Sequence, residues 1–287
     1  MKYYKELSII IITYKSDQII YKFVSKIPKK IKVIVVENSK NLSLKKNLER
    51  KFKNVSVYLR NNEGVSSSLN YGVKKIKTDY FLHLSPDLQV NYNDIKLFFK
   101  YANKLNNNFC ALGPRFLKTK KRGHIQINKN VKIEKIDSIH GSYMFMNKHR
   151  FNQIGGWDKK IFLYFEETDF CYRAKKLNLF CYQINKIKTQ TVDTTVKIED
   201  KKVRENWLNL LIWHFIWSKF YFTKKKYGLL FSIFIFIPIF IRILFRIILY
   251  KVTNDQKKLN KFKFRLSGLY NSIIGNKSYL RLNDIKG

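Results

Sequence analysis

Uninterrupted apolar strands constrain the fold of this chain more than any other feature of its sequence. Residues 7–13 (LSIIIIT) and 31–37 (IKVIVVE) are almost entirely apolar and rich in β-branched side chains, which favours strands over helices. Strands that are apolar on both faces suit a parallel sheet covered by helices on both sides. The sequence therefore predicts a buried, mostly parallel sheet near its N-terminus.

Strand-like and helical stretches alternate along the first half of the chain. The other strand-like runs are 55–59 and 80–84, and the stretches that suit helices are 16–27, 42–52, 65–77 and 93–105. This order gives βαβ units, so the predicted class is an α/β, doubly wound, Rossmann-like sheet. Ligands bind such sheets beyond the carboxyl ends of the strands.

Polar side chains follow these strands at the points where the strands end. Thr13 and Tyr14 follow the first strand, Glu37 the second and Ser85-Pro86-Asp87 the fourth, and a small, polar run at 62–72 (NEGVSSSLNYG) opens a helix. An acid after the second strand can bind a ribose, and a small-residue turn lets the backbone approach a nucleotide. Asp87 can hold a divalent cation on a diphosphate. Each residue alone also has a structural explanation, since Asp87 could cap a helix and Glu37 could be a solvated strand end.

Three acids are concentrated within residues 166–169 of a chain that is otherwise strongly basic. If 166–176 is helical, Glu166 and Asp169 share one face, and Asp169 meets Arg173, whereas Glu167 points about 100° away from Glu166. Acids at a helix N-terminus also interact favourably with the helix dipole, which is the purely structural alternative. Their concentration favours a chemical role, in which one carboxylate deprotonates an acceptor hydroxyl.

A succession of motifs in chain order carries a family resemblance. The motifs are SIIIITYKS, VVENS, NEGVSSSLNYG, LSPD, GSYMFM and GGWDKKIFLYFEETDFCYR, which together span about residues 6–185. This succession resembles family 2 glycosyltransferases, and most closely the bacterial rhamnosyltransferase-like branch, which builds lipid-linked surface polysaccharides. The resemblance implies a GT-A fold and an inverting transfer of sugar from a nucleotide donor.

The resemblance also implies a role for each matching residue. The residues that would bind the nucleotide sugar are Thr13, Tyr14, Glu37, Asn62, Gly64, Asn70, Ser85 and Asp87. Among them, Asp87 would hold Mg²⁺ or Mn²⁺ on the diphosphate of a dTDP- or UDP-linked donor. The acids that would face the acceptor are Glu166, Glu167 and Asp169, with Glu167 as the presumed base.

The chain departs from the family pattern at several positions. Relatives usually have Glu-Asp at Glu166-Glu167, Asn-Pro-Asp at Ser85-Pro86-Asp87, and glycines at Ser67 and Ser68. The histidine usually found after the catalytic helix has no counterpart around residues 189–195. These departures leave the fold intact but keep open an alternative, a glycosyltransferase-shaped subunit that has lost catalysis and serves assembly.

The remaining metal-ligating side chains show no site by their spacing. Cys110, Cys171 and Cys181 are too few and too scattered for a disulfide framework or a zinc site, and they fit a reducing cytoplasm. His83 lies inside a predicted strand. We expect structural roles for the histidines, of which the others are His124, His140, His149 and His214.

The composition changes after residue 200, so we predict a GT-A domain over 1–200 and a helical, membrane-associated region over 201–287. The second region carries 18 Lys and Arg against three acids, and its uncharged run at 227–241 continues as an apolar stretch to Tyr250. That run is shorter than the roughly 20 residues of a spanning helix, and Pro238 interrupts it. Basic flanks at both ends disfavour a single crossing. We expect an interfacial or re-entrant segment broken at Pro238, with a buried helix of a soluble second domain as the alternative.

The net charge does not decide the function by itself, because Lys, Ile and Asn are abundant throughout the sequence and a general compositional bias would also make the chain basic. The 57 Lys and Arg against 20 Asp and Glu give +37, which favours polyanionic partners such as an anionic membrane surface or nucleic acid. A basic nucleic-acid-binding protein is the less favoured alternative, because no nucleic-acid motif is present and the aromatics gather in the apolar tract. The leading hypothesis is transfer of a sugar, such as rhamnose or another hexose, to a lipid-linked glycan at the cytoplasmic face of a bacterial inner membrane.

Overall fold

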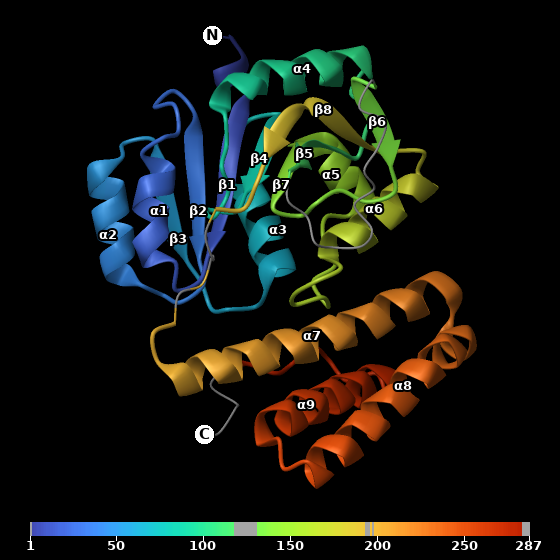
Figure 1. The fold of residues 1–287 in the computed structure, drawn as a ribbon. Helices are drawn as coiled ribbons and strands as arrows, with labels where there is room; N and C mark the ends of the chain where they lie inside the picture. Colours follow the sequence, from blue (N-terminus) through green and yellow to red (C-terminus); the bar gives the residue numbers. More distant parts are fainter. Residues whose placement is uncertain (1, 118–130, 193–195, 197, 283–287) are drawn as a thin grey trace. The chain divides into compact units, whose positions relative to one another are not determined.

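The computed structural model describes residues 2–117, 131–192, 196 and 198–282, and the chain divides into two compact units (Figure 1). The first unit comprises residues 1–158 and 166–197, and the second comprises residues 159–165 and 198–287. The boundary predicted at residue 200 assigns residues 159–165 to the first domain, whereas in the structure they group with the second unit. One contact that holds them there is a hydrogen bond of 2.8 Å from Ser218 Oγ to the carbonyl of Leu163.

The first unit is built on an eight-stranded sheet in the order β3-β2-β1-β4-β7-β5-β8-β6. The strands are β1 (Leu7–Thr13), β2 (Lys32–Glu37), β3 (Val55–Leu59), β4 (Tyr80–Leu84), β5 (Ala111–Phe116), β6 (Ile133–Ile136), β7 (Tyr143–Asn147) and β8 (Cys181–Thr189). β1 pairs in parallel with β2 and β4, and β2 with β3. β7 runs antiparallel between β4 and β5, and β6 runs antiparallel to β8.

Helices cover both faces of this sheet, which confirms the predicted α/β class. The helices of the first unit are α1 (Asp17–Val24), α2 (Leu42–Lys51), α3 (Val65–Lys75), α4 (Ile95–Lys104), α5 (Lys148–Ile154) and α6 (Glu166–Lys176), with short 3₁₀ turns η1 (Lys2–Tyr4) and η2 (Tyr92–Asp94). Ile9 of β1 belongs to a core that includes residues of α1, α2 and α4, whereas Ile10 belongs to a second core with α3, α5 and α6. Alternate residues of one strand thus fill opposite cores, so both faces must be apolar.

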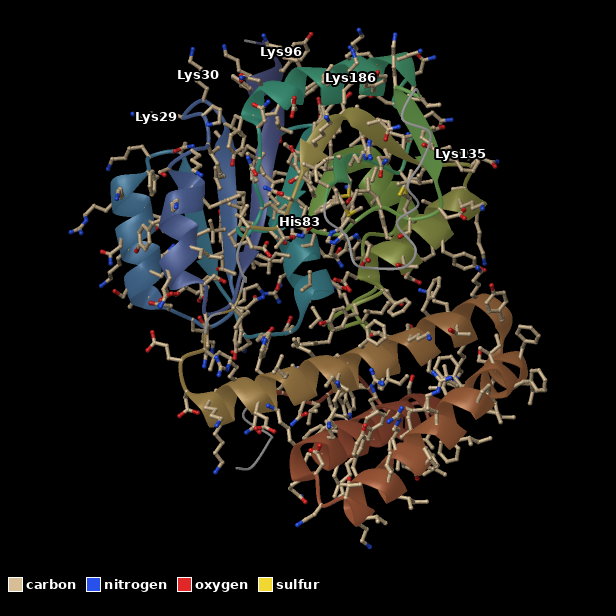
Figure 2. The ribbon with its side chains drawn as sticks, viewed as in Figure 1. Lys29, Lys30, His83, Lys96, Lys135 and Lys186 are labelled. Carbon is tan, nitrogen blue, oxygen red and sulfur yellow. The ribbon has the colours of Figure 1, made fainter. Side chains whose placement is uncertain are left out.

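His83 lies inside β4, as predicted, and is buried in the first unit (Figure 2). Its Nδ1 donates to the carbonyl of Ile10 at 3.2 Å, and burial lowers the pKa of its imidazole to about 4. Several lysines of the same unit, in contrast to His83, are exposed to solvent. Figure 2 shows Lys29, Lys30 and Lys96 toward the end of the unit at which β1 begins, opposite the carboxyl ends of the parallel strands.

The second unit consists of three helices, α7 (Lys201–Tyr227), α8 (Leu229–Val252) and α9 (Gln256–Ile273), together with residues 159–165. Phe220, Phe236 and Leu269 form the centre of its core. α7 and α9 approach closely at Gly268, where an added Cβ would lie 2.6 Å from the carbonyl oxygen of Trp213. A side chain at this position would push the two helices apart.

α8 is continuous through Pro238, so the expected break at that residue is wrong. Proline removes one backbone hydrogen bond, but buried side chains on either side of it, Phe236 and Ile243, hold the helix against its neighbours. Within the described residues, α8 is the one helix whose length and apolar composition would suffice to cross a membrane.

The three cysteines converge on one point of the first unit, so they are scattered in the sequence but not in the structure. Cys110 directly precedes β5 and Cys181 opens β8, and these two strands are parallel neighbours. Cys171 lies on α6, which packs in the same core as both. Strand pairing and helix packing thus unite residues that lie far apart in the sequence.

Candidate active site

The polar residues that follow the parallel strands share one edge of the sheet. Thr13 and Glu37 are partners in the β1–β2 register, and the amide of Asn38 donates to the carbonyl of Thr13 at 2.9 Å. Thr13 Oγ1 is buried and has no hydrogen-bond partner among the described residues. Tyr14 follows, and burial, together with the charge of Glu37, raises the pKa of its phenol. The edge therefore carries polar groups from β1 and β2 side by side.

Glu37 organises the turn after β2. Its carboxylate is fully buried and accepts hydrogen bonds from the amide and hydroxyl of Ser39 and, at 2.7 Å, from the amide of Asn41. Ser39 and Asn41 of this turn line a pocket of about 470 Å³, together with Lys15, Asp17 and Gln18. Glu37 thus acts on this pocket through the shape of the turn, and Ser39 and Asn41 are lining residues that the sequence analysis did not single out.

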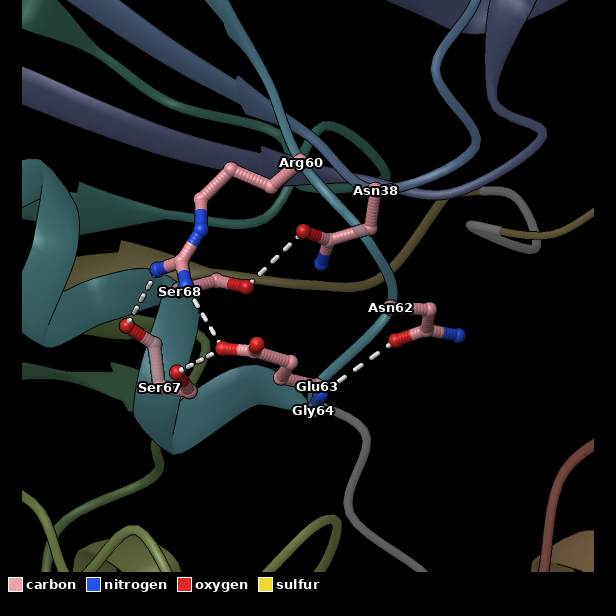
Figure 3. A network of polar contacts seen from close by, with 7 residues as sticks. All are labelled: Asn38, Arg60, Asn62, Glu63, Gly64, Ser67 and Ser68. Atoms are coloured by element: carbon pink, nitrogen blue, oxygen red, sulfur yellow. Dashed lines mark hydrogen bonds and ion pairs between the residues drawn. The ribbon is translucent and has the colours of Figure 1, made fainter.

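The run before α3 forms a polar network (Figure 3). The amide of Gly64 donates to Asn62 Oδ1 at 3.3 Å, and Gly64 begins the helix with a φ of 92°, a conformation that strains any other residue. Ser68 Oγ donates to Asn38 Oδ1 at 2.9 Å, which connects α3 to the turn after β2. Asn62 and Gly64 therefore define how the chain enters the helix beside this edge of the sheet.

Ser67, one of two serines where relatives usually have glycine, is held by the same network. Its hydroxyl donates to Glu63 Oε2 at 2.8 Å, and Arg60 pairs with the same carboxylate at 2.5 Å (Figure 3). Ser67 and Ser68 are both buried. From the first turn of α3, these two hydroxyls thus bond the helix to Glu63 and to the turn after β2.

Asn70 connects α3 to the Gly-Gly-Trp-Asp loop. Its Nδ2 donates to the carbonyl of Trp157 at 2.8 Å, and its Oδ1 accepts from the amide of Trp157 at 2.9 Å. Both ends of the side-chain amide are engaged in this pair of bonds. Asn70 therefore positions the loop that leads toward α6.

The three acids at the start of α6 have different surroundings. The helix itself spans Glu166–Lys176, as predicted. Asp169 is fully buried and pairs with Arg173 Nε at 2.8 Å. The remaining guanidinium nitrogens donate to the carbonyls of Ile154 and Gly156, each at 2.6 Å. Asp169 therefore anchors the Gly155-Gly156 turn through Arg173. Glu166 is also buried, whereas Glu167 is only half-buried.

The Ser85-Pro86-Asp87 turn is held on two sides by backbone hydrogen bonds. The amide of Ser85 donates to the carbonyl of Ser142 at 2.9 Å, and the amide of Val192 donates to the carbonyl of Asp87 at 2.8 Å. Leu88 and Thr191 form an antiparallel bridge. These bonds fix the backbone of Asp87 at the carboxyl end of β4, beside the edge that Thr13 and Glu37 share.

The loop that contains Ser142 also touches Glu167. A Cβ placed on Gly141 would lie 3.4 Å from both Cβ and Oε2 of Glu167. The chain enters α6 through Tyr164 and Phe165, whose φ values of 67° and 68° are strained for these residues. The loop of residues 140–142 thus brings the Asp87 turn and the Glu167 carboxylate to one place, a connection that the sequence did not predict.

The segment around residues 189–195, where the sequence has no counterpart of the histidine that follows the catalytic helix in relatives, is described only in part. Thr189, Gln190, Thr191 and Val192 lie in the described chain beside the Asp87 turn, whereas 193–195 fall outside the described residues. His124 also lies outside them. His140 is engaged locally, because its Nδ1 is 2.7 Å from the hydroxyl of Ser142.

Sequence comparisons agree with this arrangement. Residues 8–167, more than half of the chain, match the model of glycosyl transferase family 2. The low-salt glycan biosynthesis hexosyltransferase Agl10 of Haloferax volcanii is 29% identical over 218 residues, which are 66% of this chain and 69% of that protein. The dTDP-rhamnosyl transferase RfbF of Shigella flexneri is 25% identical over 215 residues, 69% of this chain and 70% of that protein.

A structural comparison gives the same fold at low sequence identity. The crystal structure of GalNAc-T7 with UDP, GalNAc and Mn²⁺ superposes with a TM-score of 0.52 and 10% identity, over 77% of this chain and 50% of that one. The likeness covers about half of that chain and supports the GT-A fold. The match to the family model over more than half of the chain shows that the protein is a glycosyltransferase that belongs to glycosyl transferase family 2.

Proposed function

We propose that this protein is an inverting glycosyltransferase that moves a hexose or deoxyhexose, such as rhamnose, onto a lipid-linked glycan in surface polysaccharide synthesis. The observation that carries the proposal is the loop of residues 140–142, which contacts both the Asp87 turn and Glu167. A group that can hold the donor diphosphate and a group that can take a proton are thereby supported by one segment. The names of Agl10 and RfbF support a hexosyl or rhamnosyl donor.

The nucleotide would bind along the edge formed by β1 and β2. Thr13 and Tyr14 offer polar groups there, and the pocket beside the Glu37 turn has the lysine and amide groups that suit a nucleoside diphosphate. Asn62 and Gly64 shape the neighbouring loop at the start of α3, and the first backbone amides of a helix suit the negative charge of a phosphate. These features suit a dTDP- or UDP-linked donor.

Asp87 is the residue that would hold a divalent metal. Mg²⁺ and Mn²⁺ prefer oxygen ligands, and one carboxylate together with substrate phosphates is a common arrangement for Mg²⁺. The backbone of Asp87 is fixed by Val192, and Ser85 adds a hydroxyl to the same turn. When bound, the cation would stabilise the negative charge that develops on the departing diphosphate.

Glu167 is the acid best placed to act as the base. Asp169 is committed to Arg173, and Glu166 is buried, whereas Glu167 is half-buried against Gly141. The Glu167 carboxylate would accept the proton of the acceptor hydroxyl as that oxygen forms a bond to the anomeric carbon. The bond from that carbon to the diphosphate breaks on the opposite face, so the nucleoside diphosphate leaves and the configuration inverts.

α8 supports attachment to a membrane surface. One face of the helix packs in the core of the second unit through Phe236 and Ile243. Most of its other apolar side chains are exposed, and one line of them, the exposed stripe, includes Leu230, Phe234, Ile237, Ile241, Phe245 and Ile248. Lysines at 224–226 precede the helix, so the apolar stripe and the basic flank together suit an anionic leaflet. We propose a peripheral position at the cytoplasmic face of the bacterial inner membrane, because α8 is continuous through Pro238 and a re-entrant segment was expected to break there. Reagents confined to the outer face should therefore not label Lys224–Lys226 or the chain after Lys251.

A donor panel tests the activity. Purified protein should release a nucleoside diphosphate from one dTDP- or UDP-linked sugar when Mg²⁺ or Mn²⁺ is present, and Asp87→Asn should remove the metal dependence of donor binding. Asp79→Asn, an exposed acid just before β4, is the matched control and should behave as wild type. Unchanged metal-dependent donor affinity in Asp87→Asn would exclude Asp87 from this role. Donor binding without turnover in the wild type would favour an assembly subunit that has lost catalysis.

A further inference from the structure

All three cysteines of the chain meet inside the first unit. Their sulfur atoms lie within 4.8 Å of one another, and Cys181 Sγ lies 3.0 Å from Cys171 Sγ. Each comes from a different element, since Cys110 precedes β5, Cys171 is on α6 and Cys181 opens β8. Because all three are free thiols, the cluster presents three separate sulfur ligands.

The cluster is buried, and a pocket borders it. Cys110, Cys171 and Cys181 are each at most 2% exposed. Two of them, Cys171 and Cys181, line a pocket of about 290 Å³ between β6 and α6. The pocket wall carries two acids and two lysines, Glu134, Asp137, Lys135 and Lys175, so it presents no net charge to an entering ion.

Cysteine binds metal ions as the thiolate, so each thiol of the cluster must lose its proton when a cation binds.

One cation can bind all three sulfurs, whereas a disulfide can join only two of them. A cation bound to three thiolates at about 2.3 Å, a typical zinc–sulfur distance, separates the sulfurs by about 4.0 Å in a trigonal arrangement. The Cys171–Cys181 separation of 3.0 Å must widen by about 1 Å to reach that arrangement, a shift about as large as the contraction that a disulfide would need. A disulfide between Cys171 and Cys181 would leave the third thiol without a role.

We propose that Cys110, Cys171 and Cys181 form a three-thiolate site for a soft cation such as Cu⁺ or Zn²⁺. Thiolate ligands select such cations over Mg²⁺ and Mn²⁺, so the site is chemically distinct from the one proposed at Asp87. It lies in the core that joins β5, β8 and α6. Metal binding would fasten these three elements together.

Titration of the full-length protein with Cd²⁺ tests the proposal. The protein is reduced, freed of metal with a chelator and titrated while ultraviolet thiolate-to-cadmium charge-transfer absorbance is recorded. We expect saturation at one Cd²⁺ per chain, unaffected by excess Mn²⁺. Replacing any one cysteine by alanine should lower Cd²⁺ affinity by more than about 100-fold, because losing even an outer partner of a metal ligand costs about 10–100-fold. Met144→Leu, a change in the same core that keeps every thiol, should bind as wild type.

A second measurement on the wild type avoids any loss of folding in the variants. Bound Cd²⁺ should protect all three thiols of the folded chain from alkylation, as counted by mass spectrometry. Absence of charge-transfer absorbance, or absorbance that survives the alanine changes, would overturn the proposal. Isolation of a Cys171–Cys181 disulfide that takes up no Cd²⁺ after reduction would overturn it as well.

Discussion

The exposed stripe of α8 makes a quantitative prediction about membrane binding. The triple change Leu230→Ser, Phe234→Ser and Ile241→Ser removes three apolar side chains that are 83%, 70% and 59% exposed. The opposite face of the helix, which includes Phe236 and Ile243, packs in the core of the second unit and is left untouched. The fold should therefore survive while membrane affinity falls.

The exposed fractions set the size of the effect. Complete burial of a Leu, Ile or Phe side chain is worth about 1.5–3 kcal/mol, so the exposed parts of these three side chains could contribute roughly 3–6 kcal/mol in lipid. At about 1.4 kcal/mol for each factor of ten, membrane affinity should fall by roughly 10²–10⁴-fold. Lys224–Lys226 remain and contribute about 1 kcal/mol each near an anionic surface, an attraction that salt screens. The variant should thus keep weak, salt-sensitive binding.

Cosedimentation with vesicles that contain anionic lipid, at low and high salt, measures both contributions. The matched control is Leu42→Ser, Leu177→Ser and Val192→Ser, which removes apolar side chains of the first unit that are 53%, 47% and 60% exposed. The control should bind vesicles as wild type does. Equal vesicle affinity of the α8 variant and wild type at high salt would refute the interfacial role of the stripe.

Three further predictions follow from the first unit and from the buried histidines. Glu167→Gln should lower turnover by roughly 10²–10⁴-fold and leave donor affinity unchanged, whereas a larger loss in Glu166→Gln would move the base to that residue. Arg173→Leu strands the buried Asp169 charge and should cost about 3–5 kcal/mol of unfolding free energy in urea titrations; a cost below about 1 kcal/mol would contradict the clamp. Burial lowers the pKa of His83 to about 4 and of His214 to about 3. Below pH 6.5 these two histidines bind protons in the unfolded chain but not in the folded chain. The free energy of unfolding should therefore fall by up to about 1.4 kcal/mol per pH unit for each histidine. Replacing one of the two should halve their combined contribution to this slope, as measured by urea titrations at several pH values.

Local composition was enough to predict the parallel part of the fold. β1, β3 and β4 have the predicted bounds, and β2 begins one residue later than predicted, because β-branched runs bounded by polar residues define these strands. α6 also has its predicted span. The strands around β7 were not predicted, since their pairing depends on partners far apart in the chain, such as Phe81 with Met146.

The candidate site shows the same division between local and distant information. The residue types at the strand ends indicated a nucleotide edge, but spacing alone could not show which side chains are engaged by the protein itself. Asn70 forms a hydrogen bond with a residue 87 positions away. Glu37 and Asp169 are buried, and each is bound by a partner four positions along the chain. The contact between Gly141 and Glu167 depends on the whole sheet, because β4 and β7 must pair before residues 140–142 reach their place. The convergence of the cysteines has the same cause.

The most direct test of the central claim is a single-turnover transfer assay with the donor that the panel identifies and a lipid-linked acceptor. In the presence of Mg²⁺ or Mn²⁺, wild-type protein should form a glycoside whose anomeric configuration, read by NMR, is opposite to that of the donor. Glu167→Gln should bind the same donor and form little product. A product with retained configuration, or full turnover in Glu167→Gln, would contradict the account.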